Sequence, residues 1–201
     1  MIRKVFAFLA PLPSRMRRPF ERHFFYLIHA HLMYRLEKGA FMCRPFRIDG
    51  ASAINIGAGT VMQRGGWLYA VPGDNSIPAM CIGAGCVFGY ANHFTAVSKV
   101  TIGNNVLTAN NVYISDNIHA YEDVSLPIIK QPVVFKGEVV IGDGCWIGEN
   151  ACIIGASIGR NSVIGANAVV THDIPEYSVA VGAPAVVIRQ FDQSQKRWVS
   201  V

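Results

Sequence analysis

A short motif, an isoleucine followed by glycine, recurs eight times between Ile56 and Gly165. In two runs the aliphatic position returns every six residues, at Ile141, Ile147 and Ile153, and again at Ile158, Ile164 and Val170. A helix would bring an apolar residue back every three or four positions, and an alternating strand every second one. A period of six instead favours short strands joined by corners, because the aliphatic side chain then points inward and a small residue relieves crowding at each bend.

Three such strands close one triangular coil, and coils of this kind stack into a solenoid. The sequence therefore predicts an all-β fold, a parallel β-helix of hexapeptide repeats over residues 49–189. Two segments interrupt the repeat. Gln63–Ala79 is rich in glycine and proline and is expected to be an irregular excursion, whereas residues 116–139 are expected to form a long external loop. Residues 190–201 are polar and are expected to be a C-terminal tail.

Residues 1–48 form a basic extension that differs from the repeat region. They carry a net charge of +8, whereas the rest of the chain carries −3. Apolar residues recur at helical spacing between Pro19 and Gly39, which suit the start and the end of a helix. Two interpretations stay open: the helix caps the open end of the solenoid, or residues 1–40 make a peripheral contact with an anionic membrane surface.

The cysteine pattern and the lack of a long apolar stretch bear on location. The five cysteines are odd in number and include no C-x-x-C pair, which is unlike a disulfide framework or a zinc site. No segment has the roughly 20 consecutive apolar residues that a membrane span needs. A cytoplasmic protein is expected, and peripheral contact with the inner face of the membrane stays open. No recognised nucleic-acid-binding motif is present, so nucleic acid is not an expected partner.

Several motifs resemble the hexapeptide-repeat acyltransferases, and within them the sugar O-acetyltransferases that include galactoside, maltose and bacterial surface-polysaccharide-modifying enzymes. The resemblance covers about residues 54–190. It rests on Val112-Tyr-Ile-Ser-Asp-Asn-Ile-His119, Val140-Ile-Gly-Asp-Gly-Cys-Trp-Ile-Gly-Glu-Asn150, Ser162-Val-Ile-Gly-Ala-Asn-Ala-Val-Val-Thr171, Asp173-Ile-Pro and Val181-Gly-Ala-Pro-Ala185. It implies a left-handed β-helix that assembles as a homotrimer, with acetyl-CoA held between subunits and a carbohydrate as acceptor.

The same resemblance implies roles for individual residues at the acceptor. His119 matches the family's catalytic histidine, and neutral imidazole can accept a hydroxyl proton near neutral pH. Asp116 would orient that imidazole or bind the sugar, although Asp-Asn is also good turn chemistry. Asn92 would contact the acceptor sugar, or else be a stacked polar corner residue. His93 would line the same cleft, or else be structural.

For acetyl-CoA, the resemblance implies small residues along the pantetheine arm and a cation for the phosphates. The positions that match are Trp146, Gly148, Ala166, Thr171 and Arg189, with Arg160 and Lys196 as further cations. The sequence departs from part of the family at Val186, where a basic residue is frequent, and at Glu149, where other members carry a small or neutral residue. No metal is required for this chemistry.

Three alternatives remain beside sugar O-acetylation. A γ-type carbonic anhydrase shares the fold, but it needs three histidines on a metal, and neither His93 nor His119 has a histidine within five residues. An N-acetyltransferase acting on a nucleotide-linked amino sugar would use nearly the same base chemistry. A non-catalytic β-helix that binds sugar or scaffolds an assembly is the third.

Overall fold

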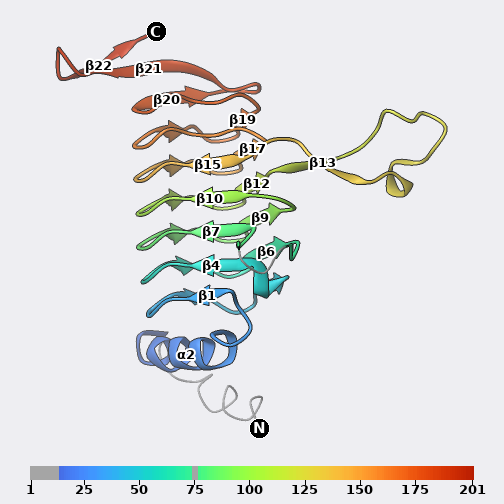
Figure 1. The fold of residues 1–201 in the computed structure, drawn as a ribbon. Coiled ribbons are helices and arrows are strands. Elements are labelled where there is room, and N and C mark those ends of the chain that lie inside the picture. The colour runs from blue at the N-terminus through green and yellow to red at the C-terminus, as the bar shows by residue number, and fades with distance from the viewer. Residues whose placement is uncertain (1–13, 74–76) are drawn as a thin grey trace.

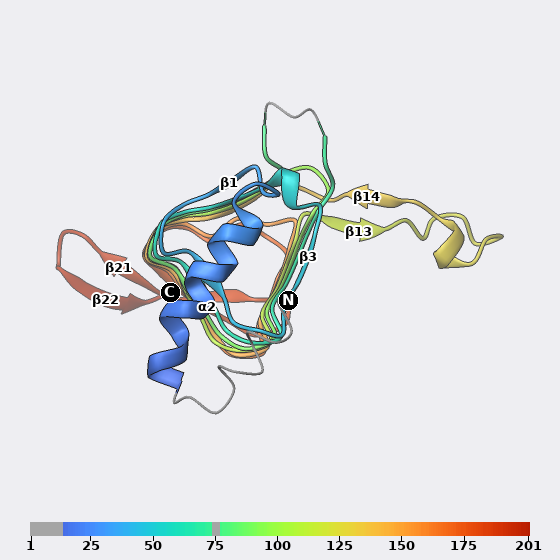
Figure 2. The same ribbon diagram turned by 90° about the horizontal axis from the view of Figure 1, so that it is seen from below.

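A computed structural model describes residues 14–73 and 77–201. The described chain winds into stacked triangular coils whose strands form three parallel sheets, one on each side of a prism (Figures 1 and 2). This is the parallel β-helix that the six-residue period predicts. Successive strands along the chain belong to different sheets, and each strand pairs with its counterpart one coil further on.

The strands are short and follow one another in a fixed rotation among the sheets. The first sheet, sheet A, holds β1 (Arg35–Leu36), β4 (Ile54–Ile56), β7 (Met80–Ile82), β10 (Val100–Ile102) and β15 (Val139–Ile141). The second, sheet B, holds β2 (Phe41–Met42), β5 (Val61–Met62), β8 (Val87–Phe88), β11 (Leu107–Thr108), β16 (Trp146–Ile147), β18 (Val163–Ile164) and β20 (Ser178–Val181). The third, sheet C, holds β3 (Arg47–Asp49), β6 (Trp67–Ala70), β9 (His93–Ala96), β12 (Tyr113–Ser115), β17 (Cys152–Ile154) and β19 (Val169–Val170).

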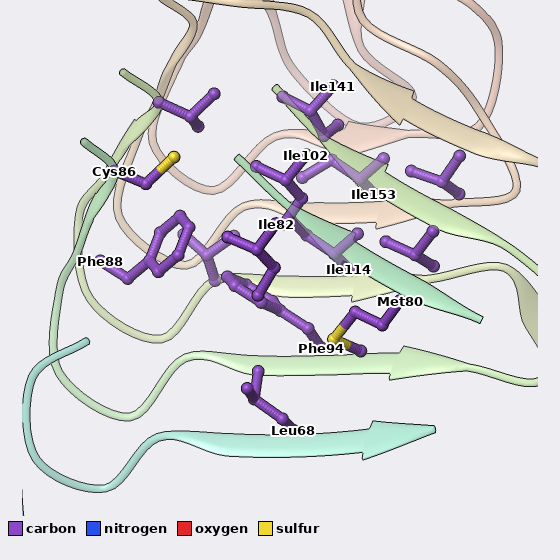
Figure 3. Packing of buried hydrophobic residues seen from close by; sticks show 14 of the residues in the cluster. Leu68, Met80, Ile82, Cys86, Phe88, Phe94, Ile102, Ile114, Ile141 and Ile153 are labelled. Atoms are coloured by element: carbon purple, nitrogen blue, oxygen red, sulfur yellow. The ribbon is translucent and has the colours of Figure 1, made fainter. Parts of the chain in front are cut away.

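The interior of the prism is a column of large apolar side chains in register from coil to coil (Figure 3). In sheet A, Ile102 pairs with Ile82 on one side and with Ile141 on the other, and all three are almost fully buried. Burying one such side chain contributes roughly 1.5–3 kcal/mol of hydrophobic free energy. The repeated aliphatic position of the sequence is therefore the core of the fold.

The glycine that follows each aliphatic residue is required by the close stacking of the corners. A Cβ added at Gly83 would lie 2.5 Å from the carbonyl oxygen of Gly103 in the next coil, which is too close for any side chain. Two residues on, Gly85 has a φ of +69°, in the left-handed region that favours glycine. The turn therefore needs one glycine that permits close stacking and, two residues later, a residue that adopts the left-handed backbone conformation.

The N-terminal helix α2 (Ser14–His29) caps the open end of the prism (Figure 2). Phe25 is buried and meets Phe41 and Phe46 of the first coil edge-to-face. Capping is therefore confirmed. The helix bounds differ from the expectation, because Pro19 lies inside the helix and the helix ends at His29 well before Gly39. Residues 1–13 of the predicted extension lie outside the described residues.

The expected boundaries of the β-helix domain were wrong at both ends. Residues 35–48, assigned to the helical extension, form the first coil, since β1 pairs with β4 and β2 with β5 although no aliphatic-glycine motif marks them. At the other end, residues 190–201 belong to an antiparallel hairpin of β21 (Val186–Asp192) and β22 (Arg197–Ser200) that continues sheet B. Strand β6 also occupies part of the segment expected to be irregular.

The predicted external loop is present, and it is ordered into a two-stranded ribbon. Its strands β13 (Asn117–His119) and β14 (Val133–Phe135) are antiparallel and project sideways from the prism (Figure 1). Two short 3-10 helices complete the fold, η1 (Ala51–Ala53) at the corner between β3 and β4 and η2 (Ile128–Lys130) in the loop. Within the described ranges, no helix combines the length and the apolar character needed to cross a membrane.

Candidate active site

A groove of about 460 Å³ lies on the outer face of sheet C, where the β13–β14 ribbon leaves the prism. Strands β6, β9 and β12 form its floor, and the ribbon forms its wall. It is lined by aromatic, small and imidazole side chains, namely Trp67, Tyr69, Val71, His93, Thr95, Val97, Tyr113, Asn117, His119 and Val133. The two histidines that the sequence singled out therefore share one cavity.

His119 is held over the groove by the geometry of the ribbon. It pairs with Val133 across the two strands, and it is exposed in the single chain. Its neighbour Asn117 donates from Nδ2 to Thr95 Oγ1, 3.3 Å away on the groove floor. This bond ties the root of the ribbon to sheet C and so fixes the side from which the imidazole enters the groove.

Asp116 does not line the groove, contrary to the expectation that it contacts the sugar or orients His119. Its buried carboxylate accepts hydrogen bonds from the backbone N–H groups of Val97, Ser98 and Lys99 at 2.7–2.9 Å, and from Asn117 Nδ2 at 2.8 Å. Its carbonyl oxygen also accepts from the N–H of Lys136. Asp116 is thus an anchor at the root of the ribbon, which is the turn role left open for it.

Asn92 is also absent from the groove, so its predicted sugar contact is corrected. The residue is fully buried at the corner between sheets B and C. Its Nδ2 donates to Thr108 Oγ1 at 2.6 Å and to the Gly89 carbonyl at 3.2 Å, and its Oδ1 accepts from the Val112 N–H at 2.7 Å. All of its hydrogen-bonding capacity serves the coil corner, as the alternative interpretation had it.

His93 lies on the groove floor within a ladder of planar side chains. Its ring stacks on Trp67 with centroids 4.0 Å apart and an interplanar angle of 3°. On the other side of Trp67, the Arg47 guanidinium lies 4.4 Å from the ring centroid. Asp49 Oδ2 accepts from both Arg47 Nε and Trp67 Nε1, at 2.6 and 2.8 Å, which locks the stack.

The same surroundings keep His93 in its neutral form. Burial lowers the pKa of the imidazole below its ordinary 6.5, and the positive charge of Arg47 lowers it further. A neutral imidazole presents one N–H donor and one acceptor nitrogen, which suits the two-way hydrogen bonding of a hydroxyl. His93 can therefore bind a hydroxyl-bearing ligand without adding charge to the groove.

The five residues predicted for acetyl-CoA lie outside the groove of the single chain. Gly148 is buried, and a Cβ there would come within 2.6 Å of the Ala166 nitrogen, so coil stacking alone requires it. Ala166 and Thr171 are exposed at the two corners that flank sheet C, and Arg189 is exposed on β21. Small exposed corners let an extended chain approach closely, and Arg189 supplies a cation, so these residues fit a CoA arm and its phosphates.

Trp146 belongs to an apolar stripe on the outer face of sheet B. It pairs with Leu107, which pairs with Val87, and the three are 51, 47 and 46% exposed. Glu149 accepts hydrogen bonds from Asn110 Nδ2 at 3.2 Å, which makes it a partner of the coil below. The stripe is a surface that a neighbouring chain could cover.

Sequence reasoning missed the aromatic floor of the groove. Trp67, Tyr69 and Tyr113 occupy the same two outward positions of successive strands in sheet C, in register with His93 and Thr95. Alignment of the segments beginning at Trp67, His93 and Tyr113 as one repeat would have revealed the column. The aliphatic-glycine motif located the core, but it does not predict which side chains occupy the outward positions of the strands.

The described ranges contain no cluster of three or more histidine, cysteine, aspartate or glutamate side chains placed to hold a metal ion. Burial raises the pKa of the Cys86 and Cys145 thiols, so at neutral pH they are poor nucleophiles as well as core residues. The groove chemistry thus rests on imidazole, hydroxyl and amide groups.

Comparison with known families supports this description. Residues 138–172 match the family model described as the hexapeptide repeat of succinyl-transferase. A protein named as a probable acetyltransferase in Mycobacterium tuberculosis is 38% identical over 64% of this chain and 44% of its own length. Galactoside O-acetyltransferase of Escherichia coli is 42% identical over 54% of this chain and 54% of its own length. An Escherichia coli protein named as a putative lipopolysaccharide-biosynthesis O-acetyl transferase is 36% identical over 53% of this chain and 58% of its own length. The chain thus spans about half the length of these curated relatives.

Solved structures extend the likeness to the fold. Galactoside acetyltransferase in complex with coenzyme A covers 96% of this chain and 79% of its own, at 27% identity and a TM-score of 0.59. The Bacillus cereus N-acyltransferase AntD, solved with dTDP-4-amino-4,6-dideoxyglucose and coenzyme A, shares the fold alone, at 15% identity and a TM-score of 0.70 over 84% of this chain and 90% of its own. The fold is the left-handed parallel β-helix, and the chain is similar in sequence and in fold to the hexapeptide-repeat acyltransferases.

Proposed function

We propose that this protein is an acetyl-CoA-dependent O-acetyltransferase that acts on a carbohydrate hydroxyl, with His119 as the general base. The observation that carries the proposal is the position of His119 over a groove whose other polar groups are neutral hydrogen-bonding side chains. Acetyl-CoA is the co-substrate and supplies the acetyl group as a thioester. No covalent enzyme intermediate is needed.

The role assigned to His119 is to accept the proton of the acceptor hydroxyl and then to donate it to the leaving sulfur. The imidazole accepts the proton of the acceptor hydroxyl as that oxygen forms its bond to the acetyl carbonyl carbon. The carbon–sulfur bond then breaks, and the imidazolium donates its proton to the leaving sulfur. The ribbon positions the imidazole, and Asp116 supports the ribbon through its backbone contacts instead of touching the ring.

The lining of the groove favours a neutral glycan over a nucleotide-linked sugar. Among the described residues that line it, none is a lysine, arginine, aspartate or glutamate. A nucleotide diphosphate would need cations to compensate its charge, and Arg47, the cation at the edge of the floor, is paired with Asp49. Tyr69, Thr95 and Asn117 instead offer hydroxyl and amide groups, which suit sugar hydroxyls. An acceptor in bacterial surface polysaccharide synthesis is consistent with the lipopolysaccharide-related relative.

The donor side of the proposal requires a homotrimer with sites between subunits. The groove of one chain contains none of the residues assigned to acetyl-CoA, so a neighbouring chain must bring Ala166, Thr171 and Arg189 to it. Two surfaces support such an assembly. The stripe around Trp146 is apolar and exposed, and the tip of the ribbon exposes Val124 and Ile129 almost completely. We place the protein in the cytoplasm.

The test is a CoA-release assay with acetyl-CoA and a panel of neutral mono- and oligosaccharides, with nucleotide-linked amino sugars as a second panel. We expect release with a neutral sugar and a product that mild alkali hydrolyses, because esters hydrolyse under these conditions and amides do not. An alkali-stable product from the second panel would show N-acetylation instead. The absence of release with every acceptor would favour a binding or scaffold role.

A further inference from the structure

We propose that the α2 end of the molecule is a docking surface for an anionic lipid bilayer. The surface consists of exposed side chains of α2 and of the turn after it, with Lys38 of the first coil; Arg22 lies at its edge, with its guanidinium 6.0 Å from the centroid of the Phe41 ring. Its members are Phe20, Arg22, Tyr26, Leu27, Leu32 and Lys38. We call it the end face.

The outward side of α2 is apolar where the cap does not need it. Phe25 points into the prism and closes the core. At 100° per residue, Phe20 and Leu27 lie on the opposite side of the helix from Phe25. They are 54 and 52% exposed, and Leu32 in the following turn is 57% exposed. Capping therefore accounts for the inner side of the helix and leaves the outer apolar side chains unexplained.

The charge of the same region identifies the occupant. Residues 14–49 carry eight lysines and arginines against three acidic residues, and two of those acids are paired within the region, Glu37 with Arg35 at 2.9 Å and Asp49 with Arg47 at 2.6 Å. Apolar side chains interleaved with cations are the composition of helices that lie in the membrane interface. A second copy of the same face would bring like charges together, which disfavours self-association. An anionic leaflet complements both the charge and the apolar side chains.

Docking by the end face would place the axis of the prism perpendicular to the plane of the bilayer, because α2 lies at one end of the stacked coils (Figure 1). In sheet C the order of strands runs from β3 through β6 and β9 to β12, so the β6 side of the groove is the side nearer α2. Such an orientation suits an acceptor glycan carried on a lipid. This consequence rests on the proposed function, whereas docking itself does not.

The experiment is co-sedimentation of the full chain with vesicles of phosphatidylcholine alone, or of phosphatidylcholine and phosphatidylglycerol in equal parts. We expect binding only to the anionic vesicles, and weaker binding at high salt. Each cation near an anionic surface contributes about a fivefold gain in partitioning, so the double variant Arg22→Gln with Lys38→Gln should lose about thirtyfold. Leu27→Ser should lose about tenfold through its apolar contact.

Matched controls lie at the other end of the chain and in the loop. Lys196→Gln with Arg197→Gln removes the same charge from the β21–β22 hairpin, and Ile77→Ser, in the loop after β6, removes an apolar side chain that is 66% exposed. Both should bind as the unmodified chain does. Equal binding to neutral and anionic vesicles, no binding to either, or equal losses in the controls would overturn the proposal. A dimer that Leu27→Ser dissociates, without lipid binding, would assign the end face to a second copy instead.

Discussion

The coils from β15 to β20 and the coils from β6 to β12 have the same interior and different exteriors. Inside, Ile153 and Ile114 pair in register and both are fully buried. Outside, sheet C carries Cys152 and Val169 in the first region, but Trp67, His93 and Tyr113 in the second. The repeat therefore builds a uniform scaffold, and the outward positions that depart from small residues mark the groove.

The largest expected effect is the loss of activity in His119→Ala. A general base contributes about a hundred- to ten-thousandfold, so CoA release with an active acceptor should fall by about three orders of magnitude. Thermal unfolding should be unchanged, because the side chain is exposed on the ribbon. His31→Ala, which removes an exposed histidine outside the groove, is the control and should keep full activity. Near-normal turnover by His119→Ala would remove the groove from the chemistry.

Substitutions in the buried scaffold should lower the stability of the protein, in contrast to the loss of activity expected for His119→Ala. Ile147→Ala empties a fully buried position of the regular coils and should lower the free energy of unfolding by about 2–5 kcal/mol. Denaturant unfolding measures the loss. Ile77→Ala, at a side chain that is 66% exposed and lies outside the groove and the ribbon, should change the free energy of unfolding by less than about 0.5 kcal/mol. Equal losses in the two variants would show that burial does not separate scaffold from surface.

A substitution at Asn92 tests whether this polar residue near the groove stabilises the coil or binds the acceptor. Asn92→Ala leaves the buried Val112 N–H without its acceptor and removes the amide donor to Thr108 Oγ1, so the free energy of unfolding should fall by about 1–3 kcal/mol. The KM for the acceptor should stay the same in the folded fraction. A raised KM with unchanged stability would instead restore Asn92 as a sugar contact.

The smallest expected effect concerns the protonation of His93. Because burial and Arg47 lower its pKa, the imidazole stays neutral at a lower pH than an ordinary histidine does. Stability that depends on the neutral form is present above pH 6.5 and is lost as the pH falls through the lowered pKa. Arg47→Gln should raise the pKa of His93 toward its ordinary value, and an NMR titration of the ring measures it. An unchanged or lower pKa would contradict the role of Arg47.

The sequence predicted the features that repeat along it. Its predictions were wrong at positions that the aliphatic-glycine motif does not mark. The period of six located the core and the corners, and the break at residue 116 located the ribbon. The first coil was missed because Leu36 and Met42 fill core positions without the glycine that marks later coils. Asn92 and Asp116 were taken for ligand contacts because sequence motifs do not show that backbone N–H groups already satisfy their oxygens. Trp67 and Tyr69 were missed because their positions form a column only once the strands are in register.

The most direct test is a structure of the assembled protein with coenzyme A bound. We expect the sulfur to lie in van der Waals contact with the His119 imidazole, at the groove on sheet C, with Arg189 of a neighbouring subunit near the phosphates. A coenzyme A molecule whose sulfur lies away from this groove, at any other surface of the assembled protein, would contradict the account.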